Sequence, residues 1–283
     1  MKYNNEWKDY KLLSTGNGYK IEYFNGVILN RPDPQVIWQF KNNNIENKAI
    51  AKYIRSNTGG GFWENKNKIP NTFNIHWRDL TFELKVMNFK HVGIFPEQAV
   101  NWARMMDLIK DSNREIKVLN LFGYTGGATV ACIKAGAFVC HVDAAKSMCE
   151  MAKTNLQLSN CDITKARFIM DDCFKFVERE IKRGKKYDAI IMDPPSYGRG
   201  PKGEKWKIEE KIFELVNLTK DVLSDNPLFY LINSYTTGLQ PTVMKNILNI
   251  VFSLNENIDA DEIGLLGQDG LVLPCGCSAF LKF

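Results

Sequence analysis

Between residues 117 and 253, short apolar runs alternate with longer segments in which apolar residues recur every three or four positions. The short runs favour buried strands, and the longer segments favour amphipathic helices. This alternation predicts an α/β fold, a Rossmann-like doubly wound parallel sheet. The expected strands are about 117–122, 137–142, 166–170, 187–193 and 227–233, and the expected helices are about 126–135, 145–158, 172–183, 207–224 and 239–253.

The end of the chain departs from this alternation. Segments 257–266 and 271–283 are strand-like on either side of Gly267-Gln268-Asp269-Gly270, with no helical segment between them. They predict an antiparallel hairpin that closes the sheet, where a dinucleotide-binding Rossmann sheet would need another parallel crossover.

The beginning of the chain is predicted to be mostly β. Asn25-Gly26 between two apolar runs predicts a hairpin turn, and alternating apolar residues over 73–86 predict a second hairpin. Segments 41–48 and 57–61 are expected to be loops. We therefore expect a small mostly-β N-terminal domain at 1–88, with possible substrate contact, and an α/β domain at 89–283, which opens with a helix starting near Pro96.

The stretch 117–129 predicts a strand, a tight loop and the start of a helix. Its glycines permit left-handed backbone conformations and leave room for a ligand, toward which the helix directs its free N–H groups. Asp143, twenty residues after Gly123, ends the next predicted strand, where its carboxylate can accept hydrogen bonds from both hydroxyls of a ribose. Glycines that serve only packing, beside a solvated aspartate, are the alternative.

A second motif, Asp193-Pro194-Pro195, follows the predicted strand 187–193. Together with Gly123-Tyr124-Thr125-Gly126-Gly127, Asp143 and Asp172, in this order, it resembles the class I S-adenosylmethionine-dependent methyltransferases. The nearest resemblance is to the bacterial branch of large-subunit rRNA methyltransferases (cytosine-C5/guanine-N2 type), which also carries a segment like 89–98. The resemblance covers about residue 85 to the end and is weaker before it.

The resemblance implies a site for S-adenosyl-L-methionine. Asp172 would accept the adenine amino group, although a helix-capping role for Asp171 or Asp172 is the alternative. Cys173 would offer a backbone contact. The residues expected to bind the donor are Phe95, Gln98, Phe122, Gly123, Tyr124, Thr125, Gly126, Gly127, Asp143, Asp172, Cys173 and Asp193.

We expect Asp193, Pro194 and Pro195 to be the catalytic residues and to contact the methyl acceptor. In amino-group methyltransferases, a carboxylate or amide and the next carbonyl accept hydrogen bonds from the substrate NH₂; here Ser196 separates the prolines from the aromatic Tyr197, a departure from the usual motif. No cysteine follows the fourth or fifth predicted strand, so the thiolate needed for cytosine C5 chemistry is missing there. Cys275 and Cys277 would reach the site only if the closing hairpin folded over it, which we do not expect. The basic loop that follows suggests Tyr197, Arg199 and Lys202 as substrate-binding residues.

Charge and composition change this picture little. The net charge of +5 and pI near 8.7 favour a polyanionic partner, which we expect to be RNA. The resemblance implies ribosomal RNA. Seven scattered cysteines favour reduced thiols in the cytoplasm, and no metal site, membrane span or secretory signal is expected. The oligomeric state is left open. Alternatives are a dinucleotide-dependent oxidoreductase, a catalytically silent donor-binding RNA-binding protein, and a methyltransferase of a non-RNA acceptor.

Overall fold

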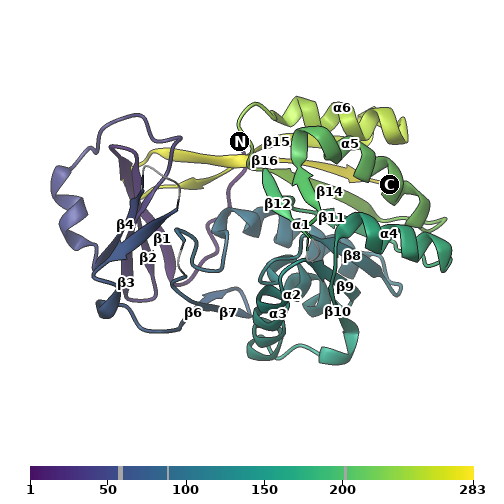
Figure 1. Ribbon diagram of the computed structural model, residues 1–283, viewed down its shortest axis with the longest axis horizontal. Coiled ribbons are helices and arrows are strands. Elements are labelled where there is room, and N and C mark those ends of the chain that lie inside the picture. The colour runs from purple at the N-terminus through teal and green to yellow at the C-terminus, as the bar shows by residue number, and fades with distance from the viewer. Residues whose placement is uncertain (57–59, 88, 201–202) are drawn as a thin grey trace. The chain divides into compact units, whose positions relative to one another are not determined.

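The computed structural model describes residues 1–56, 60–87, 89–200 and 203–283. These residues group into two compact units (Figure 1). The first comprises Met1–Val100 with Gly264–Cys275, and the second comprises Asn101–Ile263 with Gly276–Phe283. The predicted domain boundary after residue 88 thus lies inside the first unit, which also includes a segment from the end of the chain.

Among the described residues, a seven-stranded sheet forms the centre of the second unit, in the order β10-β9-β8-β11-β14-β16-β15. Strands β10 to β14 of this order are mutually parallel, and β16 runs antiparallel to β14. The chain moves outward from β8 to β10 and then returns to β11 on the other side of β8, which makes a topological switch point. The strands are β8 (Lys117–Leu121), β9 (Phe138–Asp143), β10 (Ala166–Met170), β11 (Ala189–Met192), β14 (Phe229–Ser234), β15 (Ile258–Leu266) and β16 (Val272–Lys282).

Helices cover both faces of this sheet, with α2 and α3 on one side and α4, α5 and α6 on the other (Figure 1). The second group shares one apolar cluster with the strands, in which Phe176, Leu215 and Leu248 are fully buried. Burial of such side chains stabilises the fold by roughly 1.5–3 kcal/mol each. The helices are α1 (Ala99–Asp111), α2 (Gly127–Lys134), α3 (Lys146–Leu158), α4 (Cys173–Lys182), α5 (Ile208–Thr219) and α6 (Pro241–Phe252), with short 3₁₀ turns η3 (Pro96–Gln98), η4 (Ile163–Lys165), η5 (Lys220–Val222) and η6 (Asn255–Asn257).

The first unit contains a five-stranded sheet in the order β1-β2-β3-β4-β5 and a separate two-stranded sheet, β6-β7. Its polar core is an ion pair in which Arg31 Nε and Nη2 each donate to the fully buried Glu22 carboxylate at 2.7 Å. The elements are β1 (Tyr10–Gly16), β2 (Tyr19–Phe24), β3 (Val27–Pro32), η1 (Asn43–Lys48), β4 (Ala51–Arg55), β5 (Gly61–Glu64), η2 (Lys66–Lys68), β6 (Phe73–Trp77) and β7 (Leu80–Leu84).

The predicted α/β fold, its closing hairpin and the N-terminal β-rich sheet are confirmed. Two expected loops are corrected. Part of 41–48 forms the turn η1, because the Asn42 side chain accepts a hydrogen bond from Asn44 N and caps it. The basic segment after Asp193-Pro194-Pro195 forms a two-stranded ribbon, β12 (Tyr197–Arg199) and β13 (Lys205–Lys207). The expected loop at 57–61 lies mostly outside the described residues.

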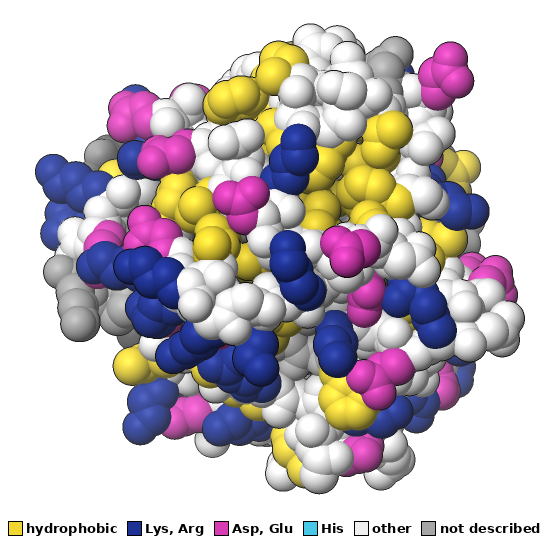
Figure 2. Space-filling model, turned by 90° about the vertical axis from the view of Figure 1, so that its right-hand side faces the viewer, with side chains coloured by type: hydrophobic (Ala, Val, Ile, Leu, Met, Phe, Trp, Pro, Cys, Tyr) yellow, Lys and Arg dark blue, Asp and Glu magenta, His cyan; other side chains and the backbone are white. Residues whose placement is uncertain are grey.

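Charged side chains are unevenly spread over the surface. On the face that Figure 2 shows, Lys and Arg side chains gather at the lower left, and apolar side chains reach the surface above the centre. All seven cysteines are free thiols. Within the described ranges, no helix has the length and apolar character needed to cross a membrane. The same residues contain no cluster of three or more metal-ligating side chains.

Candidate active site

Four of the motifs singled out in the sequence follow four adjacent strands of the second unit. The glycine loop follows β8, Asp143 ends β9, Asp172 follows β10 and Asp193 follows β11. Because these strands are parallel neighbours, their carboxyl ends meet along one edge of the sheet, beside the switch point where ligands bind in open α/β sheets. The fold therefore brings these four segments together.

The glycine loop has an unusual backbone. Phe122 and Tyr124 have left-handed φ angles of 57° and 49°, and Gly126 has a φ of 85° at the N-cap of α2. Left-handed conformations of non-glycine residues store roughly 1–3 kcal/mol each and tend to cluster at functional sites. No side chain caps α2. The free N–H groups of its first turn are thus left for water or a ligand carboxylate.

The glycines of this loop are also required by packing. A Cβ atom at Gly123 would lie 2.4 Å from the His141 ring, and one at Gly126 would lie 2.7 Å from the Ala152 Cβ. Real Cβ atoms do not approach so closely, so any side chain here would displace the loop. Close packing, rather than ligand access alone, therefore explains why these positions are glycine.

Asp143 ties the end of β9 to the glycine loop. Its Oδ2 accepts a hydrogen bond from Tyr124 N and its Oδ1 accepts one from Ala145 N, both at 2.9 Å. Burial raises the pKa of this carboxyl, and the two backbone bonds partly oppose that rise. A carboxylate offers about four acceptor positions, so Asp143 can still accept hydrogen bonds from a ribose.

Asp172 is the N-cap of α4. Its Oδ1 accepts from Lys175 N at 3.1 Å, which is the helix-capping role considered above. Its neighbour Asp171 forms an ion pair with Arg179. Cys173 is buried, and burial raises the pKa of its thiol, so it stays protonated at neutral pH and is a poor nucleophile.

The Asp193-Pro194-Pro195 segment leaves β11 beside the glycine loop, with Asp193 N 3.4 Å from Leu121 O. The Asp193 side chain is half-buried, Pro194 is buried and Pro195 is exposed. The Pro195 carbonyl accepts a hydrogen bond of 2.6 Å from the indole N–H of Trp206.

The ribbon β12-β13 follows directly, and its two faces differ. Tyr197 pairs with Lys207 and Arg199 pairs with Lys205, so these four side chains share one face, while Gly198 and Trp206 share the other. The first face is solvated: Tyr197 is 57% exposed, and all three cations are exposed. An aromatic ring among cations suits stacking and phosphate contacts with a nucleic acid.

Three predicted site residues are not among the described residues of the second unit. Phe95 and Gln98 belong to the first unit, where Phe95 packs on His91 and Gln98 is buried in the turn η3. Their role toward the donor stays a prediction. Lys202 lies outside the described residues.

Sequence reasoning missed two buried residues of this edge, Trp206 and His141. Trp206 lies in the segment expected to be a basic loop, and its hydrogen bond to Pro195 depends on a ribbon that the sequence does not predict. His141 Nδ1 lies 2.9 Å from the Thr129 hydroxyl, which also accepts from Asn120 Nδ2. Burial lowers the pKa of His141 to about 4, so the ring is neutral at pH 7.

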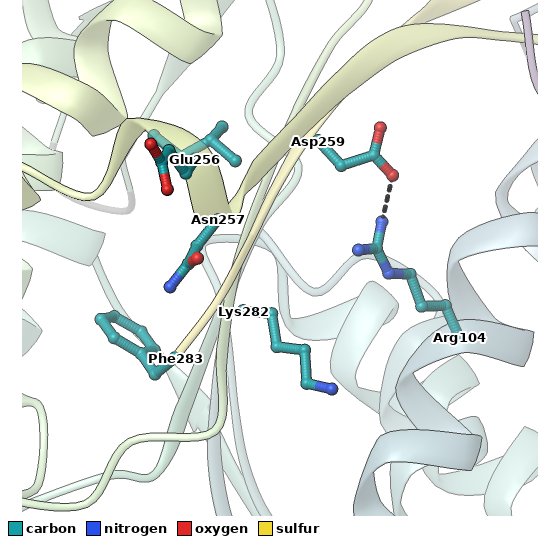
Figure 3. Close-up of a pocket in the computed structure, with 7 residues that line it drawn as sticks. Arg104, Glu256, Asn257, Asp259, Lys282 and Phe283 are labelled. Atoms are coloured by element: carbon teal, nitrogen blue, oxygen red, sulfur yellow. Dashed lines mark hydrogen bonds and ion pairs between the residues drawn. The ribbon is translucent and has the colours of Figure 1, made fainter.

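A groove of about 410 Å³ lies at the opposite edge of the sheet (Figure 3). Its lining includes Lys282, which pairs with Phe229 at the start of β14, whereas the glycine loop follows the end of β8. In Figure 3, Arg104 reaches Asp259, with which it forms an ion pair of 2.6 Å. This groove is therefore separate from the motif-bearing edge.

Comparison with known proteins agrees with the geometry. Residues 55–218, more than half of the chain, match the family described as S-adenosylmethionine-dependent methyltransferase. Among curated relatives, ribosomal RNA large subunit methyltransferase I of Tolumonas auensis is 44% identical over 106 residues, and that of Enterobacter sp. (strain 638) is 39% identical over 106 residues. Each match covers 37% of this chain and 26% of the relative, so the chain spans only about a quarter of their length.

Solved structures match over more of the chain. A SAM-dependent methyltransferase from Agrobacterium tumefaciens is 30% identical with a TM-score of 0.92, and the match covers 99% of this chain and 92% of that one. A protein from Streptococcus mutans (17% identity, TM-score 0.76) and a protein solved in complex with SAH (18% identity, TM-score 0.77) share the fold; each match covers 99% of this chain and 76% of the other.

Proposed function

Because the chain belongs to the family of S-adenosylmethionine-dependent methyltransferases, we propose that it methylates a base nitrogen of structured RNA, with ribosomal RNA as the first substrate to test. The curated relatives support this substrate, since their names specify ribosomal RNA. The observation that carries the proposal is the ribbon β12-β13, which presents Tyr197, Arg199 and Lys205 directly after Asp193-Pro194-Pro195.

The residues of the second unit suit the donor, which supplies an electrophilic methyl group. The uncapped first turn of α2 offers N–H groups to the carboxylate of its methionine part. Asp143 is a half-buried carboxylate that accepts from the backbone N–H groups of Tyr124 and Ala145, and its remaining acceptor positions suit a ribose diol. Asp172 keeps one carboxylate oxygen beyond the one used by the cap, and that oxygen can accept from the adenine amino group.

Methyl transfer from a sulfonium is an in-line displacement, so the protein contributes mainly by positioning the two reactants. Asp193 Oδ atoms and the Pro194 carbonyl would accept hydrogen bonds from an amino group of the base, and they would hold its nitrogen lone pair toward the methyl group. The Pro195 carbonyl is already used by Trp206. Cys275 and Cys277 have thiol pKa values raised by burial, Cys277 to about 11, which disfavours a thiolate mechanism.

One experiment tests this proposal. The protein is incubated with methyl-labelled donor and, in parallel, total RNA, small ribosomal subunits and large ribosomal subunits, and nucleosides are then identified by mass spectrometry. We expect label in an N-methylated nucleoside. 5-Methylcytidine as the product would reject the nitrogen assignment. Labelling of a protein or small molecule, with no labelled RNA, would reject the RNA substrate, and donor binding with no transfer to any acceptor would favour a catalytically silent protein.

A further inference from the structure

Trp206 lies at the carboxyl edge of the seven-stranded sheet, where the segments after β8, β10 and β11 meet. It belongs to β13, its side chain is only 7% exposed, and it is part of the core cluster of the second unit. Its indole ring lies 4.7 Å from the Phe122 ring and 6.2 Å from the Phe174 ring, measured between centroids. Phe122 precedes Gly123 in the loop after β8, and Phe174 follows the Asp172 cap after β10. One side chain thus contacts two segments assigned to the donor.

The same side chain holds the acceptor segment. Its N–H donates to the Pro195 carbonyl at 2.6 Å, and no other indole position could make this bond, because indole has a single polar hydrogen. Backbone geometry reinforces the contact, since Ser196 O accepts from Ile208 N at 3.1 Å on the other side of Trp206. Pro195 is therefore bonded to the Trp206 side chain and Ser196 to Ile208, the first residue of α5, while residues 197–199 pair with β13.

These contacts of residues 195 and 196 also orient the solvated face of the ribbon β12-β13. Gly198 lies opposite Trp206, and a Cβ at Gly198 would make ordinary van der Waals contact with Pro195 Cγ at 3.4 Å, so Gly198 and Trp206 share the inner face beside Pro195. Tyr197 and Arg199 must then point to the outer face. Trp206 occupies one of the two acceptor positions of Pro195 O, and Pro194 O, next to Asp193 in the chain, is the carbonyl we assign to the acceptor.

We propose that Trp206 is a positioning residue that sets the acceptor segment against the donor pocket. The Trp206 ring is held in position by packing against Phe122 and Phe174. Its N–H in turn holds Pro195 in position through the hydrogen bond to the Pro195 carbonyl. The inference rests on the proposed function only in calling 193–195 the acceptor segment. It predicts that loss of the Trp206 N–H displaces the acceptor segment, and so slows methyl transfer, while the affinity for the donor is retained.

The test compares Trp206→Phe, which keeps an aromatic ring but has no N–H, with the unaltered protein. Calorimetry with S-adenosylhomocysteine should give a Kd within about two-fold of the unaltered protein. Amide hydrogen exchange of residues 196–199 should rise at least about five-fold, the factor expected for loss of one net hydrogen bond. With a fixed amount of total RNA and the donor concentration varied, kcat should fall about 10- to 100-fold while the KM for donor stays constant, because small displacements of a reactant have effects of that size.

Two further variants sharpen the result. Trp206→His, which retains a ring N–H, should recover part of the lost exchange protection, and Trp206→Ala should weaken S-adenosylhomocysteine binding as well, since it also removes the ring. Trp38→Phe is the matched control, because it removes an indole N–H bond of 3.0 Å to Thr15 in the first unit and should change neither quantity.

The outcomes are distinguishable. Unchanged exchange at 196–199 in Trp206→Phe, or a loss of donor affinity as large as that of Trp206→Ala, would overturn the positioning role. If the unaltered protein transfers no label to RNA, the proposed substrate fails, while the exchange and calorimetry results still decide the role of Trp206.

Discussion

At the scale of single residues, His141 links the stability of the protein to its glycine loop. The ring lies beneath Gly123 and is fully buried, and burial lowers its pKa to about 4. The unfolded chain takes up a proton near the ordinary pKa of about 6.5, whereas the folded chain does so only near 4. The unfolded state thus binds more protons between these values, and folding stability must fall as the pH falls from 6.5 to 4.

We expect this group to contribute on the order of 3 kcal/mol of that loss, at about 1.4 kcal/mol per pKa unit. His91 in the first unit, with its pKa lowered by burial to about 3, adds a loss of the same sign. Urea unfolding at pH 7, 5.5 and 4.5 measures the sum. His141→Phe should reduce the slope of stability against pH, and an identical slope in this variant would contradict the assignment.

Asp143 is expected to hold the ribose of the donor while it anchors Tyr124 N. Asp143→Ala should weaken S-adenosylhomocysteine binding by roughly 10- to 100-fold, since hydrogen bonds to charged groups contribute about 1.5–3 kcal/mol. Calorimetry measures the change. Asp162→Ala is the matched control, because Asp162 also accepts a backbone N–H, from Thr164, in the separate turn η4. Equal affinity in the two variants, or binding of NAD by the unaltered protein, would contradict this role.

Asp193 is expected to serve the acceptor. Asp193→Ala should keep donor affinity within a few fold and abolish methyl transfer, because the amino group of the base would lose its acceptor. Single-turnover methylation with preformed donor complex separates the two effects. Asp225→Ala, at an exposed position before β14, should leave both unchanged. Turnover that persists in Asp193→Ala would assign Asp193 to the donor side instead.

At the scale of elements, α4 shows how a capping residue and a binding residue can coincide. Asp172→Ala should lower the free energy of unfolding by about 1 kcal/mol, because it removes the N-cap. Asp172→Ser keeps a good cap but shortens the side chain and removes its charge. If Asp172 binds adenine, both variants lose donor affinity and only the alanine variant loses stability. Full donor affinity in the serine variant would leave Asp172 as a cap alone.

The elements of the second unit were predictable because each carries its own apolar pattern within its local sequence. The apolar run 187–193 and the periodic segment 172–183 carry their own signals, and β11 and α4 formed there. The ribbon β12-β13 gave no such signal. Its strands are short and contain Gly198, Arg199 and Lys205, residues without strand preference, and it is held by Trp206 packing against distant rings. Tertiary contacts of this kind are invisible in local periodicity.

Across the whole molecule, the division into two compact units also depends on contacts between residues distant in the chain, which local sequence patterns do not reveal. The pattern assigned residues 264–275 to the closing hairpin alone, yet they group with the first unit. Asp269 Oδ2 accepts from the Ser14 hydroxyl at 2.7 Å, and Gln268 N donates to Leu12 O at 2.9 Å. These bonds join residues more than 250 positions apart in sequence. Composition and spacing carry no information on such pairs, whereas they sufficed to locate the strands and helices around the glycine loop.

The net charge of +5 and the exposed cations of the ribbon lead to a prediction about the intact protein with RNA. Each phosphate neutralised by a lysine or arginine releases counterions, so log K falls with log salt by about 0.7 per contact for single strands and about 0.9 for duplexes. Replacing Arg199 and Lys205 with alanine should therefore reduce RNA affinity and flatten the slope by about 1.4 to 1.8, measured by filter binding at several salt concentrations. Lys245→Ala with Lys182→Ala removes the same charge from α6 and α4 and serves as the control. If both pairs flatten the slope equally, the RNA is bound through overall charge, and the ribbon is not a specific contact. If only the ribbon pair flattens it, the contacted phosphates lie beside Asp193, where the methyl group is to be delivered.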